Sequence, residues 1–173
     1  MKKPEVNQYL KDCIADAYLV LLKEKPAGKI TVDEIAARAG VGRVTVFRAF
    51  TSKEEIVTYK FIRMWEQYAE LNDIMVRNRF DLSNALPFFE YNYSIKHILT
   101  IVYAAGMQEA LHESFYRIMV PGDRDDVFAE YRERFYAHGL YGLLDGWILH
   151  DFRETPAQMA EMIREIVGGE GNR

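Results

Sequence analysis

The side chains best suited to recognition chemistry in this sequence lie close together, between residues 43 and 48. Arg43 can present its guanidinium group to O6 and N7 of guanine or to a phosphate. Thr45 offers a hydroxyl and a methyl group, and Arg48 adds a second cation at the end of the same segment. Such groups on one short helix are typical of a surface that contacts DNA bases.

A helix-turn-helix over residues 30–49 would hold these side chains in place. Thr31 and Glu34 have the spacing of a capping box that begins a short helix, and Gly40 can take the left-handed conformation that ends it. A second short helix follows at once over Gly42–Phe47. Two helices joined by a short turn that contains glycine favour a helix-turn-helix, whose second helix enters the major groove. The spacing alone also fits an ordinary helical hairpin.

The distribution of charge is consistent with a nucleic-acid contact near the N-terminus. Residues 1–63 hold 12 Lys and Arg against 8 Asp and Glu, whereas residues 64–173 hold 10 against 18. A basic part in a chain of net charge −4 indicates where a nucleic acid would bind. A surplus of this size also occurs on ordinary solvated surfaces.

The composition predicts a soluble, all-α protein of one or two domains with about nine helices. Of the 173 residues, 49% are hydrophobic and 28% are charged, and apolar residues recur at helical spacing without the alternation typical of strands. The single cysteine, Cys13, excludes a disulfide framework and fits a reducing cytoplasm. The charged N-terminus is unlike a signal peptide, and no apolar run reaches the roughly 18 residues of a membrane span. We therefore expect a cytoplasmic protein that does not enter a membrane.

Helix-start signals recur further along the chain. Ser52 with Glu55 and Thr155 with Gln158 each place a hydroxyl three residues before a carboxyl or amide. In that arrangement each side chain satisfies a backbone N–H at the start of a helix. We expect a fourth helix over residues 52–75 and a last helix after Thr155.

The stretch ITVDEIAARAGVGRVTVFRAFTSKEEI, residues 30–56, resembles the DNA-binding region of the TetR family of transcriptional regulators. Members share a capped helix, an A-G-V turn, a short recognition helix with an aromatic near its end, and then F-x-S-K-E-E-L or similar. The match covers roughly the first 65 residues. The resemblance implies a three-helix helix-turn-helix DNA-binding domain over residues 1–50, followed by a helical regulatory and dimerisation domain over residues 51–173.

The resemblance also implies roles for individual residues. Thr31 would offer its hydroxyl and backbone N–H to a phosphate, and Lys53 matches a phosphate-contacting lysine. Phe47 stands where the family most often has tyrosine, which puts one phosphate contact in doubt, and Gly42 replaces the more usual serine cap at a cost of a few tenths of a kcal/mol, roughly. The expected DNA-contacting residues are Thr31, Gly42, Arg43, Val44, Thr45, Phe47, Arg48 and Lys53.

The segments AHGLYGLLDGWILHD and TPAQMAEMI resemble the last two helices of shorter TetR-type regulatory domains, which pair with their symmetry mates as a four-helix bundle. Gly139, Gly142 and Gly146 permit close backbone approach, and the large apolar side chains exceed what one core needs, which is typical of an interface. Trp147 could equally be buried within one chain. The expected dimer interface consists of Leu140, Leu143, Leu144, Trp147, Met159 and Ile163.

The middle of the chain is rich in aromatic residues and methionine, with a few polar groups among them. Such side chains are a reasonable lining for a small apolar or aromatic ligand, although stripes of this kind more often form a core. The expected ligand-contacting residues are Trp65, Tyr68, Phe89, Tyr93, Tyr103, Met107 and His112.

These observations predict a homodimeric regulator that binds double-stranded DNA at a palindromic operator and is released from it by a small molecule, as a repressor. No cofactor or metal is expected, and catalysis is disfavoured because the four histidines show no H-x-x-x-H or H-E-x-x-H pattern. Two alternatives stay open: a TetR-like adaptor or coactivator that acts mainly through protein contacts, and DNA binding without a ligand switch.

Overall fold

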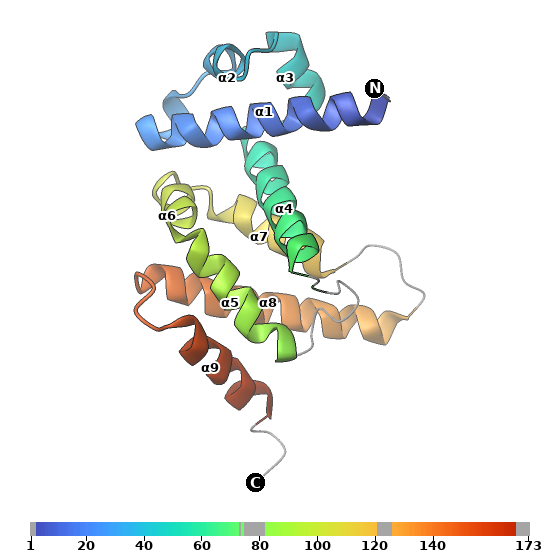
Figure 1. Ribbon diagram of the computed structural model, residues 1–173, viewed down its shortest axis with the longest axis vertical. Helices are drawn as coiled ribbons and strands as arrows, with labels where there is room; N and C mark the ends of the chain where they lie inside the picture. The colour runs from blue at the N-terminus through green and yellow to red at the C-terminus, as the bar shows by residue number, and fades with distance from the viewer. Residues whose placement is uncertain (1–2, 73, 75–81, 121–125, 169–173) are drawn as a thin grey trace. The chain divides into compact units, whose positions relative to one another are not determined.

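The computed structural model describes residues 3–72, 74, 82–120 and 126–168, and in these ranges the chain forms nine α-helices and no strand (Figure 1). The all-α prediction is confirmed. The helices are α1 (Lys3–Glu24), α2 (Val32–Ala39), α3 (Arg43–Ala49), α4 (Lys53–Leu71), α5 (Ala85–Ser94), α6 (Lys96–Ala104), α7 (Gln108–Met119), α8 (Val127–Leu149) and α9 (Pro156–Gly168), with short 3-10 helices η1 (Ala27–Lys29) and η3 (Leu82–Asn84).

The chain packs as two compact units. Unit 1 comprises Met1–Met64 and Ile101–Ser114, and unit 2 comprises Trp65–Thr100 and Phe115–Arg173. The boundary expected between residues 50 and 51 therefore lies inside unit 1. A buried hydrogen bond shows why: the Thr58 hydroxyl on α4 donates to the Ala110 carbonyl oxygen on α7 at 3.0 Å. The start of α4 and the first half of α7 thus belong to the same core as the N-terminal helices.

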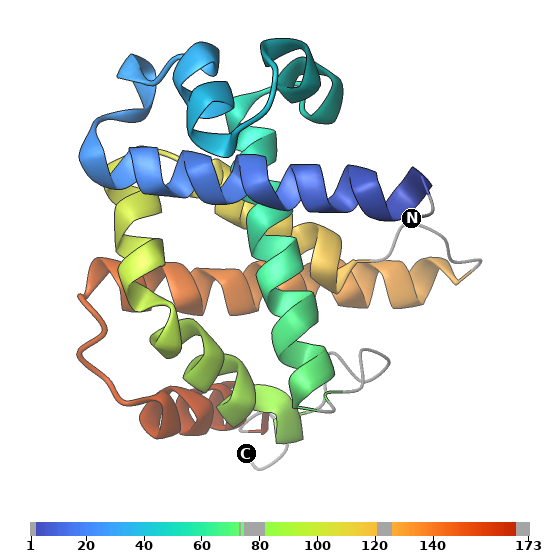
Figure 2. The same ribbon diagram turned by 45° about the horizontal axis from the view of Figure 1, so that its top comes forward.

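The core of unit 1 joins α1 to the helix-turn-helix. Ile14 and Tyr18 on α1, Ile35 on α2, Val46 on α3 and Val57 on α4 are all nearly fully buried. Figure 2 shows α2 and α3 packed on one side of α1. This apolar packing fixes the two short helices, which would be marginal in isolation because helix nucleation is costly.

Two of the three predicted capping boxes form completely. The backbone N–H of Thr155 donates to the Gln158 amide oxygen at 2.8 Å, and the N–H of Gln158 donates back to the Thr155 hydroxyl at 3.3 Å. The second box forms only half: the N–H of Glu55 donates to the Ser52 hydroxyl at 3.1 Å, but the Glu55 carboxylate accepts from the N–H and hydroxyl of Thr51 instead. The Glu55 carboxylate bonds to Thr51 rather than to the backbone N–H of Ser52, because Thr51 offers two donors to one carboxylate oxygen.

An aromatic cluster forms the centre of unit 2. The Trp147 ring on α8 is 2% exposed and makes edge contacts with Phe89 at 5.6 Å and Phe152 at 5.1 Å between ring centroids. The indole N–H donates to the Glu154 carbonyl oxygen at 3.0 Å, so the tryptophan also holds the chain between α8 and α9. None of the described helices is both long and apolar enough to cross a membrane.

Candidate nucleic-acid interface

The turn between α2 and α3 has the geometry expected from its glycine. Gly40 adopts a left-handed conformation with φ of +67°, which glycine reaches without the strain that a Cβ atom would add. The N–H of Val41 then donates to the Ala36 carbonyl oxygen at 3.0 Å and closes the end of α2. Gly42 caps α3 without a side-chain hydrogen bond, as its lack of a hydroxyl dictates. The two short helices of a helix-turn-helix are thus present.

The solvent-facing side of α3 carries two cations and two apolar side chains. Val44 is 62% exposed and Phe47 is 56% exposed, while Arg43 and Arg48 are exposed beside them. Positions 43 and 47 and positions 44 and 48 are four residues apart, and 44 and 47 are three apart, so the four side chains form neighbouring rows on one side of α3. Val46 and Phe50 point the other way and are buried, and Thr45 is half-buried.

The Arg43 guanidinium has partners on both sides. One nitrogen, Nη1, lies 3.5 Å from the carboxylate of Asp33 on α2, and the guanidinium carbon lies 5.4 Å from the centroid of the Phe47 ring. Exposed ion pairs and exposed cation–π contacts each stabilise a fold only slightly. Their effect here is to favour one orientation of a long, otherwise freely rotating side chain on the outer face of α3.

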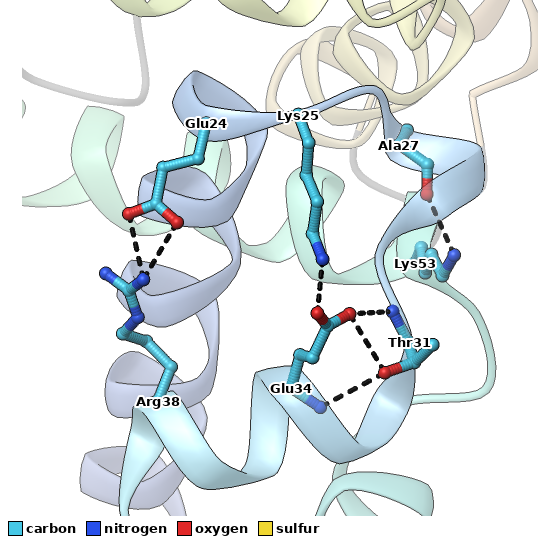
Figure 3. Close-up of polar contacts among 7 residues, drawn as sticks. All are labelled: Glu24, Lys25, Ala27, Thr31, Glu34, Arg38 and Lys53. Atoms are coloured by element: carbon cyan, nitrogen blue, oxygen red, sulfur yellow. Dashed lines mark hydrogen bonds and ion pairs between the residues drawn. The ribbon is translucent and has the colours of Figure 1, made fainter.

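The start of α2 is closed by a network around Glu34 (Figure 3). The N–H and the hydroxyl of Thr31 both donate to the Glu34 carboxylate, at 2.8 and 3.0 Å, and Lys25 forms an ion pair with it. These groups, Lys25 first, lower the pKa of Glu34 to about 2. Both Thr31 donors expected at a phosphate are therefore engaged within the protein. The first-turn amides of Val32 and Asp33, which have no acceptor within the helix, are the alternative donors.

Replacing Glu34 by glutamine is expected to lower the melting temperature at neutral pH, because the ion pair with Lys25 is lost while an acceptor for the capping box remains. The pKa of Glu34 is lower in the folded state than the ordinary value of about 4.3, so its stabilisation is full above that value and is lost as the pH falls through about 2. The difference in melting temperature between the two proteins should therefore shrink below about pH 4. Circular dichroism melts over this range measure it, and a difference that stays constant would contradict the assignment.

The Lys53 ammonium donates to the Ala27 carbonyl oxygen at 2.9 Å (Figure 3). The lysine thus ties the first turn of α4 to η1 and has two further N–H groups for other acceptors. Arg38, further along α2, donates to both carboxylate oxygens of Glu24 on α1 at 2.8 and 2.9 Å. These contacts brace α2 against the end of α1 and the start of α4 against η1.

Comparison with known proteins supports this geometry. The family model described as "Bacterial regulatory proteins, tetR family" matches residues 14–59, which include α2, the turn and α3. A second model of the same family, described as "Transcriptional regulator C-terminal region", matches residues 83–169, about half of the chain. The chain belongs to the TetR family.

A solved relative shows the same fold for almost the whole length. The crystal structure of a TetR transcriptional regulator from Rhodococcus sp. RHA1 aligns with a TM-score of 0.54 at 16% identity, over 91% of this chain and 93% of that one. No functionally curated protein matches the chain. As a TetR-family transcriptional regulator, the protein has its DNA-binding domain at the N-terminus.

Unit 2 of this TetR-family protein contains a pocket of about 330 Å³. Its walls are mainly apolar, and Asn84, Tyr136 and the Trp65 indole supply polar groups. About half of the lining residues come from α8 and α9, and smaller parts come from α4, η3, α5 and α7. The volume is at the lower end of the range of about 300–1,000 Å³ that holds small molecules.

Of the ligand-contacting residues expected from the sequence, only Trp65 lines this pocket. Phe89 and Tyr93 pack on the Trp147 ring, and the Tyr68 hydroxyl donates to the Pro87 carbonyl oxygen at 3.3 Å. The three other expected residues are not in the lining and belong to unit 1: they are Tyr103, Met107 and His112.

The residues expected at the dimer interface fall into two groups. Leu144, Trp147 and Met159 are at most 3% exposed within one chain, so their side chains belong to the core of unit 2 and have no surface for a partner. Leu140, Leu143 and Ile163 instead line the pocket. The large apolar side chains that are exposed on α8 and α9 were not singled out by sequence reasoning; they include Phe128, Tyr131, Phe135, Leu149, Met162 and Ile166.

Proposed function

We propose that this TetR-family protein is a homodimeric repressor that binds a palindromic operator and leaves it when a small apolar molecule occupies the pocket of unit 2. The observation that carries the proposal is the outer face of α3. Two guanidinium groups and two apolar side chains project from it, while the buried side chains of the same helix fix it on α1 and α2.

Contacts to DNA divide into those that read bases and those that position the protein. Arg43 and Thr45, in the first half of α3, and Arg48 at its end face the bases of the major groove. Lys53 and the start of α2 near Thr31 contact phosphates, which fix register without reading sequence. Binding should weaken steeply with salt because each neutralised phosphate releases counterions.

Dimerisation through α8 and α9 rests on two features of unit 2. Exposed apolar side chains continue along both helices, which is unusual for a surface that only meets water. Gly139, Gly142 and Gly146 lie inside α8, and a Cβ atom at any of them would meet nothing within 4 Å in this chain. Gly139 and Gly142 line the pocket, whereas Gly146 does not. Glycine inside a helix costs about 0.5–1 kcal/mol, so close approach of a partner helix best accounts for Gly146.

A ligand in the pocket would act on the helix that reaches the DNA-binding domain. Trp65 lines the pocket and belongs to α4, whose first residue is Lys53. The Tyr91 ring lies 5.2 Å from Trp65 between ring centroids, and its buried hydroxyl has no hydrogen-bond partner among the described residues, which makes it a donor available next to the pocket wall. A small aromatic molecule with one or two polar groups fits these walls, and it would favour one of two conformations of the dimer.

Filling the pocket tests its role. Gly139→Leu is expected to weaken binding of the neutral fluorescent probe N-phenyl-1-naphthylamine at least about tenfold, because the new side chain occupies the apolar space that the probe needs. Gly28→Leu is the control: the same change, also with open space at the Cβ, at an exposed glycine of η1 that lies outside the pocket and outside α8 and α9. Fluorescence titration measures both, and equal binding by the two variants would place the probe elsewhere.

An adaptor that acts mainly through protein contacts is the second candidate, since Phe47 lacks the hydroxyl with which most family members contact a phosphate. Anisotropy titration of duplex DNA at two salt concentrations separates the two functions. A regulator binds one sequence with an affinity that falls steeply with salt, whereas an adaptor shows no selected sequence. A repressor of this kind acts in the cytoplasm, where bacterial DNA lies.

A further inference from the structure

The α3 helix carries fewer kinds of base-reading side chain than a helix-turn-helix could use. The helix reads RVTVFRA, without asparagine, glutamine, aspartate or glutamate. It therefore lacks the amide side chains that pair bidentately with adenine through N6 and N7 and the carboxylates that accept from N4 of cytosine, and the half-buried Thr45 supplies its one hydroxyl. What α3 presents to solvent is arginine together with Val44 and Phe47, each more than half exposed.

Apart from the contact between the Phe47 ring and the Arg43 guanidinium, the two exposed apolar side chains take no part in the buried packing of α3. Val46 and Phe50 supply the buried contacts of α3 and the turn after it, and the Phe50 ring packs edge-on against Tyr59 at 5.4 Å between centroids. Val44 and Phe47 lie on the opposite side, between the cations Arg43 and Arg48. Apolar groups flanked by cations on a DNA-facing helix match a target that is anionic overall and locally apolar.

We propose that Val44 and Phe47 read the 5-methyl groups of thymine, next to a guanine read by Arg43. The inference rests on the proposed function. The thymine methyl is the one apolar group that unmodified bases present in the major groove, and apolar side chains are its usual partners. Each operator half-site is then specified by guanine hydrogen bonds and thymine methyl contacts.

The spacing of these residues agrees with neighbouring base pairs. Val44 and Phe47 are three residues apart, or about 4.5 Å along the helix axis, which is close to one base step of about 3.4 Å. The Phe47 ring also contacts the Arg43 guanidinium, which Asp33 approaches from α2. One base pair read by Arg43 therefore lies beside the pair whose methyl contacts Phe47.

Removing single methyl groups from DNA tests the inference. A duplex selected by the protein from random sequences is prepared with deoxyuridine in place of each thymine in turn, a change that deletes the methyl and keeps base pairing. For the wild-type protein, affinity is expected to fall about fourfold for each contacted methyl, the effect of exposing one buried methyl-sized group. Replacing the contacted thymine in both half-sites of one duplex should multiply the two losses of affinity.

The variants Val44→Ala and Phe47→Ala should each lose sensitivity at one methyl position and keep it at the other. Val20→Ala is the matched control, because Val20 is also exposed but lies on α1. All three variants should have the melting temperature of the wild type, because none of these side chains is buried. A change in DNA binding then does not reflect a change in folding.

Two results would overturn the inference while leaving the DNA-binding function intact. One is a wild-type protein that binds the selected duplex equally well with and without the methyl groups. The other is a methyl effect that persists unchanged in both α3 variants, which would assign it to another residue such as Thr45. If no duplex is selected at all, the proposed function and this inference fall together.

Discussion

Replacing Arg43 by alanine is expected to abolish specific operator binding while leaving weak binding to unrelated DNA. A guanidinium that pairs with guanine contributes about 1–3 kcal/mol of discrimination. Because a dimer loses the contact in both half-sites, operator affinity should fall at least about 30-fold. Fluorescence anisotropy with a selected duplex and with a scrambled duplex measures the specific and non-specific affinities separately.

Arg38→Ala provides a control of equal charge. Arg38 lies on α2 and donates to Glu24 on α1, so its loss should weaken binding to both duplexes by a similar, smaller factor. The ratio of specific to non-specific affinity should fall only for Arg43→Ala. If the two variants lost affinity equally on both duplexes, Arg43 would act only as a positive charge, and base reading would have to come from elsewhere.

The second large effect is expected in unit 2, where Trp147→Ala should destabilise the fold by about 3–5 kcal/mol. The side chain is 2% exposed, contacts several rings, and donates the hydrogen bond to the Glu154 carbonyl oxygen. Its removal leaves a cavity and an unpaired acceptor within a single chain. Urea unfolding monitored by circular dichroism measures the free energy of unfolding.

Met162→Glu on α9 is the companion variant for the dimer surface. Met162 is 38% exposed, so a carboxylate there costs the folded monomer little, but it would be buried without a partner in a dimer formed through α8 and α9. Sedimentation velocity should show a folded monomer for this variant. The contrary pattern, in which Trp147→Ala gives a stable monomer and Met162→Glu stays dimeric, would assign Trp147 to the dimer interface.

Local signals made the helix-turn-helix predictable from sequence. Thr31 with Glu34 and the left-handed Gly40 act within a few residues, so their geometry follows from residue type and spacing. The half-formed box at Ser52 shows the limit of this reasoning. There the competing residue, Thr51, is only one position away, and the choice depends on which donors converge on the Glu55 carboxylate.

The pocket and the surface of α8 were harder to predict, because helical spacing shows which residues share a face but not what covers that face. Leu140 and Leu144 both suit an interface by type, yet one lines the pocket and the other is 1% exposed in the core. Likewise Phe89 and Tyr93 are aromatic residues of a plausible lining that instead pack on Trp147. These assignments depend on how distant helices pack against each other.

Selection of the protein's target from random duplexes, followed by the mass of the resulting complex, tests the central claim most directly. We expect an enriched inverted repeat whose half-sites are centred about 34 Å or a multiple of it apart, bound by two chains and released as salt is raised. Sedimentation of the labelled duplex with the protein gives the stoichiometry. A folded, dimeric protein that enriches no sequence would contradict the regulator function and favour an adaptor that recognises another protein.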